Sequence, residues 1–181
     1  EVLVPDFNDK DWALEMVMEA RPHIFNHNIE TVERLTPLVR SRAKYGRSLT
    51  VLKKAKDMVD GKVATKSGLM LGLGEREEEI FQAMDDLREH GVTVLTMGQY
   101  LRPTAMHLPV VEYITPERFE ELRQIALTKG FRHVASGPLV RSSYHAADFH
   151  PEEDVLDAIE SDLAKRAESK IEQGGKVTSS A

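Results

Sequence analysis

The sequence predicts an α/β fold built around a parallel sheet. Short apolar runs of strand length alternate along the chain with longer segments in which apolar residues recur at helical spacing. Glycines, prolines and helix-capping residues separate these segments. Strands that alternate with helices are typical of βα units, in which each helix returns the chain so that the next strand lies parallel to the last.

The alternation places each element on the chain. The expected strands cover residues 1–4, 23–27, 63–71, 92–98 and 132–136. The expected helices cover residues 9–20, 31–41, 48–59, 75–90, 116–129 and 152–171. The length suits one domain with a real core, which we assign to residues 1–150, followed by a terminal helix and tail at 151–181.

Two of the helices have clear ends. Gly91 follows the helix expected at 75–90, where a C-cap belongs. The helix expected at 116–129 has Thr115 as its N-cap, Pro116 at its first helical position and Gly130 as its stop. Apolar residues on the inward faces of these two helices are Ile80, Met84, Leu87, Phe119, Leu122 and Ala126.

The composition narrows the class of protein. The net charge of −6 argues against a broad nucleic-acid-binding surface, and no apolar run is long enough to span a bilayer. The chain has no cysteine and therefore no disulfide. No secretory signal is recognisable at its start. Because the first residue is Glu1 and not methionine, we expect the chain to be a fragment of a longer protein.

A glycine-rich segment ends the strand expected at 63–71. It reads Lys-Ser-Gly-Leu-Met-Leu-Gly-Leu-Gly-Glu over residues 66–75. Its glycines either let the backbone pass close to a ligand or form an ordinary turn into the next helix. Acidic residues at the start of that helix would repel an anion, so a neutral or cationic ligand fits better than a phosphate.

A row of polar residues follows the second expected strand. Alternation along an extended chain puts Asn26, Asn28 and Glu30 on one face and His27 on the other. Amide and carboxylate groups in such a row suit ribose hydroxyls or an ammonium group. The alternative is a helix cap formed by Asn28 or Thr31.

The fourth expected strand ends in Gly-Gln-Tyr at residues 98–100. The amide of Gln99 is able to hydrogen-bond a heterocycle, and Tyr100 is able to stack on it or donate to it. The alternative for Tyr100 is a core position with a satisfied hydroxyl group.

The most informative segment is Gly-Pro-Leu-Val-Arg-Ser-Ser-Tyr-His-Ala at residues 137–146. No hydrophobic period or turn rule requires this run. Taken by itself, a serine pair after a strand favours a helix N-cap. Its serine and histidine do not define a catalytic triad, and the histidines of the chain lack the spacing of a zinc site.

Taken together, these segments resemble lipoyl synthases, a family of radical S-adenosylmethionine enzymes, from Glu1 to about His150. The family has similar stretches in the same order. They are Glu-Val-Leu-Val-Pro-Asp-Phe, Asn-His-Asn-Ile-Glu-Thr, Lys-Ser-Gly-Leu-Met-Leu-Gly-Leu-Gly-Glu, Gly-Gln-Tyr-Leu-x-Pro, His-Leu-Pro-Val and Gly-Pro-Leu-Val-Arg-Ser-Ser-Tyr. Their order and the last motif are highly specific.

The resemblance implies the C-terminal portion of a partial (β/α)6 barrel of the TIM type, with parallel strands. It also implies S-adenosylmethionine and two [4Fe–4S] clusters as cofactors. One cluster cleaves S-adenosylmethionine to a radical, which abstracts hydrogen from C6 and C8 of a protein-bound octanoyl chain. The auxiliary cluster is the source of the two sulfur atoms that complete the lipoyl group, so the enzyme is a sulfurtransferase.

The resemblance implies partners as well. These are octanoylated lipoyl carrier domains, found in E2 subunits of 2-oxoacid dehydrogenases and in the glycine cleavage H protein, and an electron donor such as flavodoxin or ferredoxin. Neither nucleic acid nor a membrane is an expected partner. The implied compartment is the cytoplasm in a bacterium, and the mitochondrial matrix or plastid in a eukaryote.

Site residues follow from the matching motifs. Residues expected to bind S-adenosylmethionine are Asn28, Glu30, Lys66, Gly68, Met70, Gly72, Glu75 and Gln99. Ser142 or Ser143 is expected to be a ligand of the auxiliary cluster, with Ser142 favoured. Arg141 is expected to act in catalysis, by ordering its loop or by offsetting the charge of the cluster.

One departure from the family is large. The cysteines that hold both clusters precede the equivalent of Glu1, so we expect this chain alone to bind neither cluster and to be inactive. A different class of function stays open, namely a cluster-free binding module or scaffold derived from a radical-enzyme barrel. A phosphate-binding barrel enzyme is disfavoured by the acidic helix start. Residues 151–181 have no firm counterpart in the family.

Overall fold

The structure is a computed structural model that describes residues 1–58 and 63–142. The chain divides into two units, Glu1–Phe149 and His150–Ala181, and the described residues all lie in the first. The helix and tail expected after residue 150 therefore lie outside the described residues. No helix within the described residues is long and apolar enough to cross a membrane.

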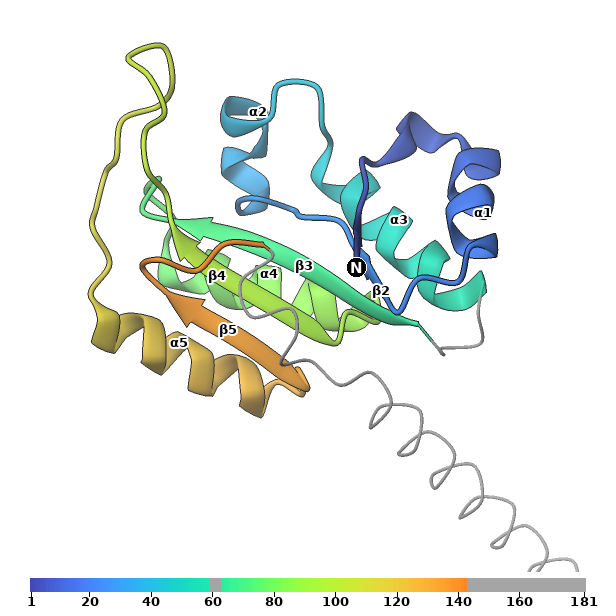
Figure 1. The fold of residues 1–181 in the computed structure, drawn as a ribbon. Coiled ribbons are helices and arrows are strands. Elements are labelled where there is room, and N and C mark those ends of the chain that lie inside the picture. Colours follow the sequence, from blue (N-terminus) through green and yellow to red (C-terminus); the bar gives the residue numbers. More distant parts are fainter. Residues whose placement is uncertain (59–62, 143–181) are drawn as a thin grey trace, which may run out of the picture. The chain divides into compact units, whose positions relative to one another are not determined.

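Five strands form a single parallel sheet in the described part of the chain (Figure 1). They are β1 (Val2–Leu3), β2 (Ile24–Asn26), β3 (Ala64–Leu71), β4 (Val94–Gln99) and β5 (His133–Gly137). Their order in the sheet is their order in the chain, and each neighbouring pair is parallel. The predicted α/β fold with a parallel sheet is confirmed, and each expected strand lies close to its predicted bounds.

The helices lie between the strands, as predicted. They are α1 (Asp11–Glu19), α2 (Thr36–Val39), α3 (Tyr45–Met58), α4 (Glu77–Glu89) and α5 (Pro116–Thr128). Two 3-10 turns, Phe7–Asp9 and Glu33–Leu35, precede α1 and α2. The helix α3 begins three residues before its predicted start at residue 48.

The helix expected at 31–41 is the main difference between prediction and structure. A 3-10 turn runs into α2, which is a single helical turn. Glu30 pairs with Leu69 of β3, and the chain is still extended at Val32, with φ −68° and ψ 160°. The chain stays extended just after this pairing, so residues 31 and 32 at the start of the expected helix are not helical.

The predicted ends of α4 and α5 are confirmed. The Thr115 hydroxyl accepts a hydrogen bond from the Arg118 amide at 3.2 Å, which caps α5. Gly91 and Gly130 follow the two helices with φ of +79° and +92°, in the left-handed region that favours glycine. The predicted inward residues of both helices are all buried.

The two faces of the sheet have different surroundings. Leu69, Leu71, Leu95 and Met97 are buried in the hydrophobic core, which also contains the inward residues of the helices. Because successive strand residues point to opposite faces, the other face carries Lys66, Gly68, Met70, Thr96 and Gly98. Strands in sequential order with right-handed crossovers place their helices on one face, so this second face is left for a site.

Candidate cofactor cavity

A cavity of about 400 Å³ lies at the carboxyl ends of the strands, on the face away from the core. Gly68 and Met70 of β3 line it beside their neighbours on β4, because the strand register pairs Gly68 with Thr96 and Met70 with Gly98. Parallel α/β proteins usually bind ligands at this edge of the sheet. The volume is sufficient for a small organic cofactor.

The segment after β2 forms the polar wall of the cavity. Asn28 and Glu30 both line it, and the Asn28 amide nitrogen donates to Glu30 Oε1 at 3.2 Å. The side-chain oxygen of Asn28 is buried and has no hydrogen-bond partner among residues 1–58 and 63–142. A Cβ atom on Gly68 would lie 2.8 Å from that oxygen, so glycine is needed at residue 68 for this wall to reach the sheet.

Glu30 lies in a strained turn. Its φ is +68°, and the Thr31 amide donates to the Ile29 carbonyl at 2.9 Å, which closes a three-residue γ-turn around Glu30. Two hydrogen bonds to β3 hold the turn, one from the Glu30 amide to Gly68 O at 2.9 Å and one from the Met70 amide to Glu30 O at 2.8 Å. Such strain costs on the order of 1–3 kcal/mol and is found most often at functional sites.

Gln99 lines the cavity, but its side-chain amide is already hydrogen-bonded to the backbone of the protein. The amide nitrogen donates to the carbonyl oxygens of Tyr100 and Glu112 at 3.0 Å each, and the amide oxygen accepts from Ile114 N at 2.9 Å. These bonds anchor the long loop between β4 and α5 (Figure 1). The Tyr100 hydroxyl donates to Leu108 O at 2.8 Å, so Tyr100 has the core position that was its alternative interpretation.

Gly72 and Glu75 lie outside the cavity lining. Gly72 has φ +103°, and a Cβ there would lie 2.4 Å from the side chain of Gln99 and from the carbonyl oxygen of Glu112. Glu75 Oε2 accepts from the amides of Gly72 and Leu73 at 3.0 and 3.1 Å. A carboxylate of the chain itself therefore fills the position where a phosphate would bind, in agreement with the argument from sequence against an anion.

Arg34 fixes the same glycine turn from the other side. Its guanidinium donates to Gly74 O at 2.8 Å and to both carboxylate oxygens of Glu79, at 2.6 and 2.8 Å. The hydrogen bond from Arg34 lowers the pKa of Glu79 to about 2, with help from the Arg76 amide. The turn between β3 and α4 is thus tied to the segment that follows Glu30.

Lys66 also lies outside the cavity lining, two residues before Gly68 on β3 and beside Asn26, the last residue of β2. Its buried ammonium group donates to Glu1 Oε2 at 2.8 Å. The other oxygen of Glu1 accepts from the Asn26 amide nitrogen at 2.7 Å. Of the predicted polar row, Asn28 and Glu30 therefore line the cavity while Asn26 belongs to this buried ion-pair cluster.

Residues after β5 close another side of the cavity. Arg141 and Ser142 line it, and the Arg141 guanidinium donates to Val140 O at 2.7 Å within its own turn. Ser143 lies outside the described residues. Within residues 1–58 and 63–142, no group of three or more histidine, aspartate or glutamate side chains is arranged to hold a metal ion.

Sequence reasoning missed several lining residues. Thr96 and Gly98 share the face of Gly68 and Met70 and follow from alternation once the register of β3 and β4 is known. The other lining residues that were not predicted are Leu3, Leu69, Leu101 and Val140.

Comparison with known proteins shows which proteins the chain is similar to. The chain is 62% identical over 146 residues to a lipoyl synthase of Rubrobacter xylanophilus, which covers 81% of this chain and 45% of the relative. It is 55% identical over 155 residues to one of Chlorobaculum parvum (86% and 52%) and 52% identical over 170 residues to one of Halalkalibacterium halodurans (94% and 54%). The chain is homologous to the lipoyl synthases. The resemblance noted in the sequence is thereby confirmed.

The match covers the C-terminal part of the relatives, so the chain spans about half the length of the lipoyl synthases that it matches. No family model matches the chain. Among solved structures, a Bacillus subtilis HMG-CoA lyase is similar with a TM-score of 0.47 and 17% identity, over 70% of this chain and 40% of that one.

Proposed function

We propose that this chain is the C-terminal part of a lipoyl synthase. The complete protein would insert two sulfur atoms at C6 and C8 of a protein-bound octanoyl chain. The observation that carries the proposal is the convergence of Asn28, Glu30, Gly68 and Ser142 on one cavity, in a chain 52–62% identical to lipoyl synthases. Residues 1–150 would complete a partial (β/α)6 barrel, with 151–181 as a terminal helix and tail.

The residues of the cavity fit S-adenosylmethionine. Asn28 offers a buried oxygen that lacks a partner within the described part of the chain. Glu30 offers a carboxylate to a cationic ligand, and Gly68 leaves space that a side chain would fill. Among the other predicted contacts, Met70 and Gln99 line the cavity. Lys66, Gly72 and Glu75 would support the site from outside the lining.

S-adenosylmethionine would supply the radical that removes hydrogen from the octanoyl chain. The work of this chain is to bind and orient it. The carboxylate of Glu30 and the amide of Asn28 would fix the polar part of the ligand, and the apolar side chain of Met70 would pack against it.

The residues of this chain do not fit an iron–sulfur cluster by themselves, because the chain has no cysteine. We propose Ser142 or Ser143 as the one ligand that this part of the protein gives to the auxiliary cluster, with Ser142 favoured because it lines the cavity. Arg141 beside it would order the turn and offset the cluster charge. The cysteine ligands of both clusters would come from the part of the protein that this chain lacks.

The remaining assignments rest on the same homology. The partners would be octanoylated lipoyl carrier domains of 2-oxoacid dehydrogenase E2 subunits and the glycine cleavage H protein, with flavodoxin or ferredoxin as electron donor. The compartment would be the cytoplasm of a bacterium, or the mitochondrial matrix or plastid of a eukaryote.

The test uses the complete protein with reconstituted clusters. Asn28→Ala and Glu30→Gln should each reduce 5′-deoxyadenosine formation while iron content stays at the wild-type level. Glu33→Gln is the matched control, because Glu33 is exposed and away from the cavity lining. Wild-type yields from both site variants would remove these residues from the cofactor site. A complete protein that binds no iron would favour the cluster-free binding module instead.

A further inference from the structure

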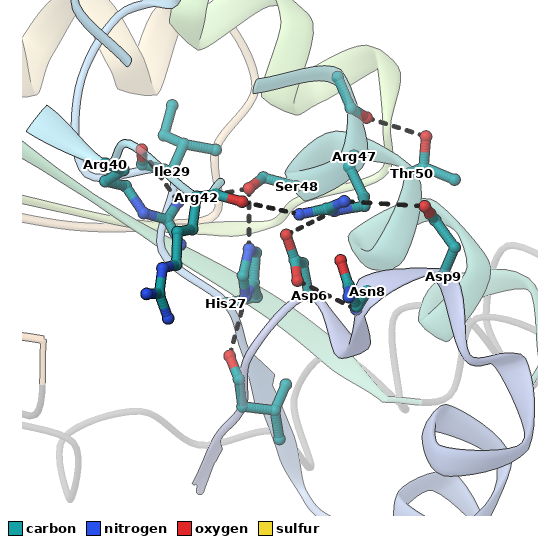
Figure 2. Close-up of polar contacts among 12 residues, drawn as sticks. Asp6, Asn8, Asp9, His27, Ile29, Arg40, Arg42, Arg47, Ser48 and Thr50 are labelled. Atoms are coloured by element: carbon teal, nitrogen blue, oxygen red, sulfur yellow. Dashed lines mark hydrogen bonds and ion pairs between the residues drawn. The ribbon is translucent and has the colours of Figure 1, made fainter. Parts of the chain in front are cut away.

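Arg40 lies behind the polar wall of the cavity and contacts it through the backbone. Its Nη1 donates to the carbonyl oxygen of Asn28 at 2.9 Å. It also donates to the carbonyl oxygen of Ile29 at 3.4 Å and to Ser48 Oγ at 3.3 Å (Figure 2). None of these contacts enters the cavity. The guanidinium therefore holds the two residues that precede the strained Glu30.

Arg40 is itself held by a chain of hydrogen bonds whose direction is fixed. Val4 O can only accept, so His27 Nδ1, 2.8 Å away, carries a hydrogen. In neutral His27 the other ring nitrogen then accepts from the Ser48 hydroxyl at 2.9 Å. The Ser48 oxygen in turn accepts from Arg40. Figure 2 shows His27 between the strand ends and Ser48 of α3.

We propose that Arg40 is a positioning residue that holds the Asn28–Glu30 turn against β3 and so sets the Asn28 amide and the Glu30 carboxylate in the cavity. The inference rests on the proposed function of that cavity. Its physical basis is the strain at Glu30, since a positive φ at a non-glycine residue persists only where the surroundings enforce it. The β3 hydrogen bonds enforce the turn on one side, and Arg40 does so on the other.

Arginine suits this role better than lysine. A planar guanidinium with donors in fixed directions is able to bond two carbonyls and a hydroxyl together. An ammonium group on a flexible stem provides the charge without this geometry. The Arg40→Lys variant should therefore restore only part of what Arg40→Met removes.

The first experiment is hydrogen exchange on the complete protein without ligand. Arg40→Met should speed exchange of the Glu30 and Met70 amides, which bond across the turn, on the order of tenfold. Amides of α5 should exchange at the wild-type rate. Arg42→Met is the matched control, because Arg42 is an exposed arginine two residues away and its loss removes the same charge. Unchanged exchange at Glu30 and Met70 would overturn the proposal.

The second experiment is calorimetric titration with S-adenosylmethionine. Arg40→Met should raise the Kd on the order of tenfold, Arg40→Lys less, and Arg42→Met not at all. Faster exchange at the turn with an unchanged Kd would show that Arg40 stabilises the fold without positioning the site, and would overturn the proposal. If Arg40→Met does not fold, Arg40→Lys gives both readouts.

The two measurements separate this inference from the proposed function. A wild-type protein that binds no S-adenosylmethionine would refute the assigned function of the cavity. The exchange rates would still decide whether Arg40 holds the Asn28–Glu30 turn.

Discussion

The carbonyl oxygen of Val140 lies over Gly98, 2.3 Å from the position that a Cβ would take there. The turn that follows β5 therefore crosses β4 at a residue without a side chain. This crossing brings Arg141 and Ser142 to the cavity. The absence of a side chain at Gly98 thus allows the start of the Arg-Ser-Ser-Tyr segment to lie against β4.

Gly98→Ala should displace this turn. The added methyl group has no room beneath Val140, and overpacking of this kind costs roughly 1–3 kcal/mol. We expect lower stability in denaturant unfolding and a larger loss of lipoyl product than of 5′-deoxyadenosine in the complete enzyme. Gly46→Ala is the control, since nothing lies within 4 Å of its Cβ position on α3, and it should be neutral or slightly stabilising. Equal changes in stability and in lipoyl product for Gly98→Ala and Gly46→Ala would contradict the contact between the turn and Gly98.

Ser142→Ala should separate the two halves of the proposed reaction. In the proposed reaction the cleavage of S-adenosylmethionine would depend on the other cluster, so the variant should still cleave it while lipoyl product collapses. Ser143→Ala is the comparison and should keep product formation if Ser142 is the ligand. Both quantities are measured together on reconstituted complete enzyme. Normal product from both alanine variants would refute a serine ligand in this protein.

Glu30→Gly and Glu30→Ala should reverse the usual order of stability. Glycine normally destabilises relative to alanine, but at φ +68° alanine keeps the strain and glycine does not. The glycine variant should be more stable by about 1 kcal/mol in denaturant unfolding. Both variants should lose affinity for S-adenosylmethionine.

Glycine and alanine variants of Glu121 are the control for the stability order expected at residue 30. Glu121 is an exposed residue in the middle of α5, so there the alanine variant should be the more stable of the pair. An alanine variant at residue 30 that equals the glycine variant in stability would mean that the turn relaxes at little cost.

His27 should make stability depend on pH. Burial lowers its pKa below the ordinary 6.5, and the charge of Arg40 acts in the same direction, against the hydrogen bond to Val4 and the carboxylate of Asp6. The unfolded state therefore takes up a proton first as the pH falls. The stabilisation is complete above 6.5 and is lost as the pH falls below that value toward the folded-state pKa.

Thermal midpoints between about pH 8 and about pH 5.5 test this dependence. His27→Gln should flatten it, while His23→Gln should leave it as in the wild type because His23 is exposed. A steep wild-type profile that survives His27→Gln would assign the dependence to another group.

Local pattern was sufficient for the elements of the fold. Short apolar runs predicted the strands and helical spacing predicted the helices. Thr115, Gly91 and Gly130 predicted helix ends, because caps and periodicity depend on neighbours in the sequence. The helix expected at 31–41 was shortened because Glu30 pairs with Leu69, a residue far away in the chain. The spacing of apolar residues along the chain does not predict a pairing between residues so far apart in the sequence.

The motifs determined which segments gather at the site, since the carboxyl ends of parallel strands meet at one edge of the sheet. Only the tertiary structure decided which of their residues line the cavity and which support it. Asn28 and Glu30 face the cavity, whereas Gly72 and Glu75 complete a turn and Lys66 pairs with Glu1. The contact of Arg40 with Asn28 and the crossing of Val140 over Gly98 also required the folded chain, because each joins backbone atoms that no periodic pattern relates.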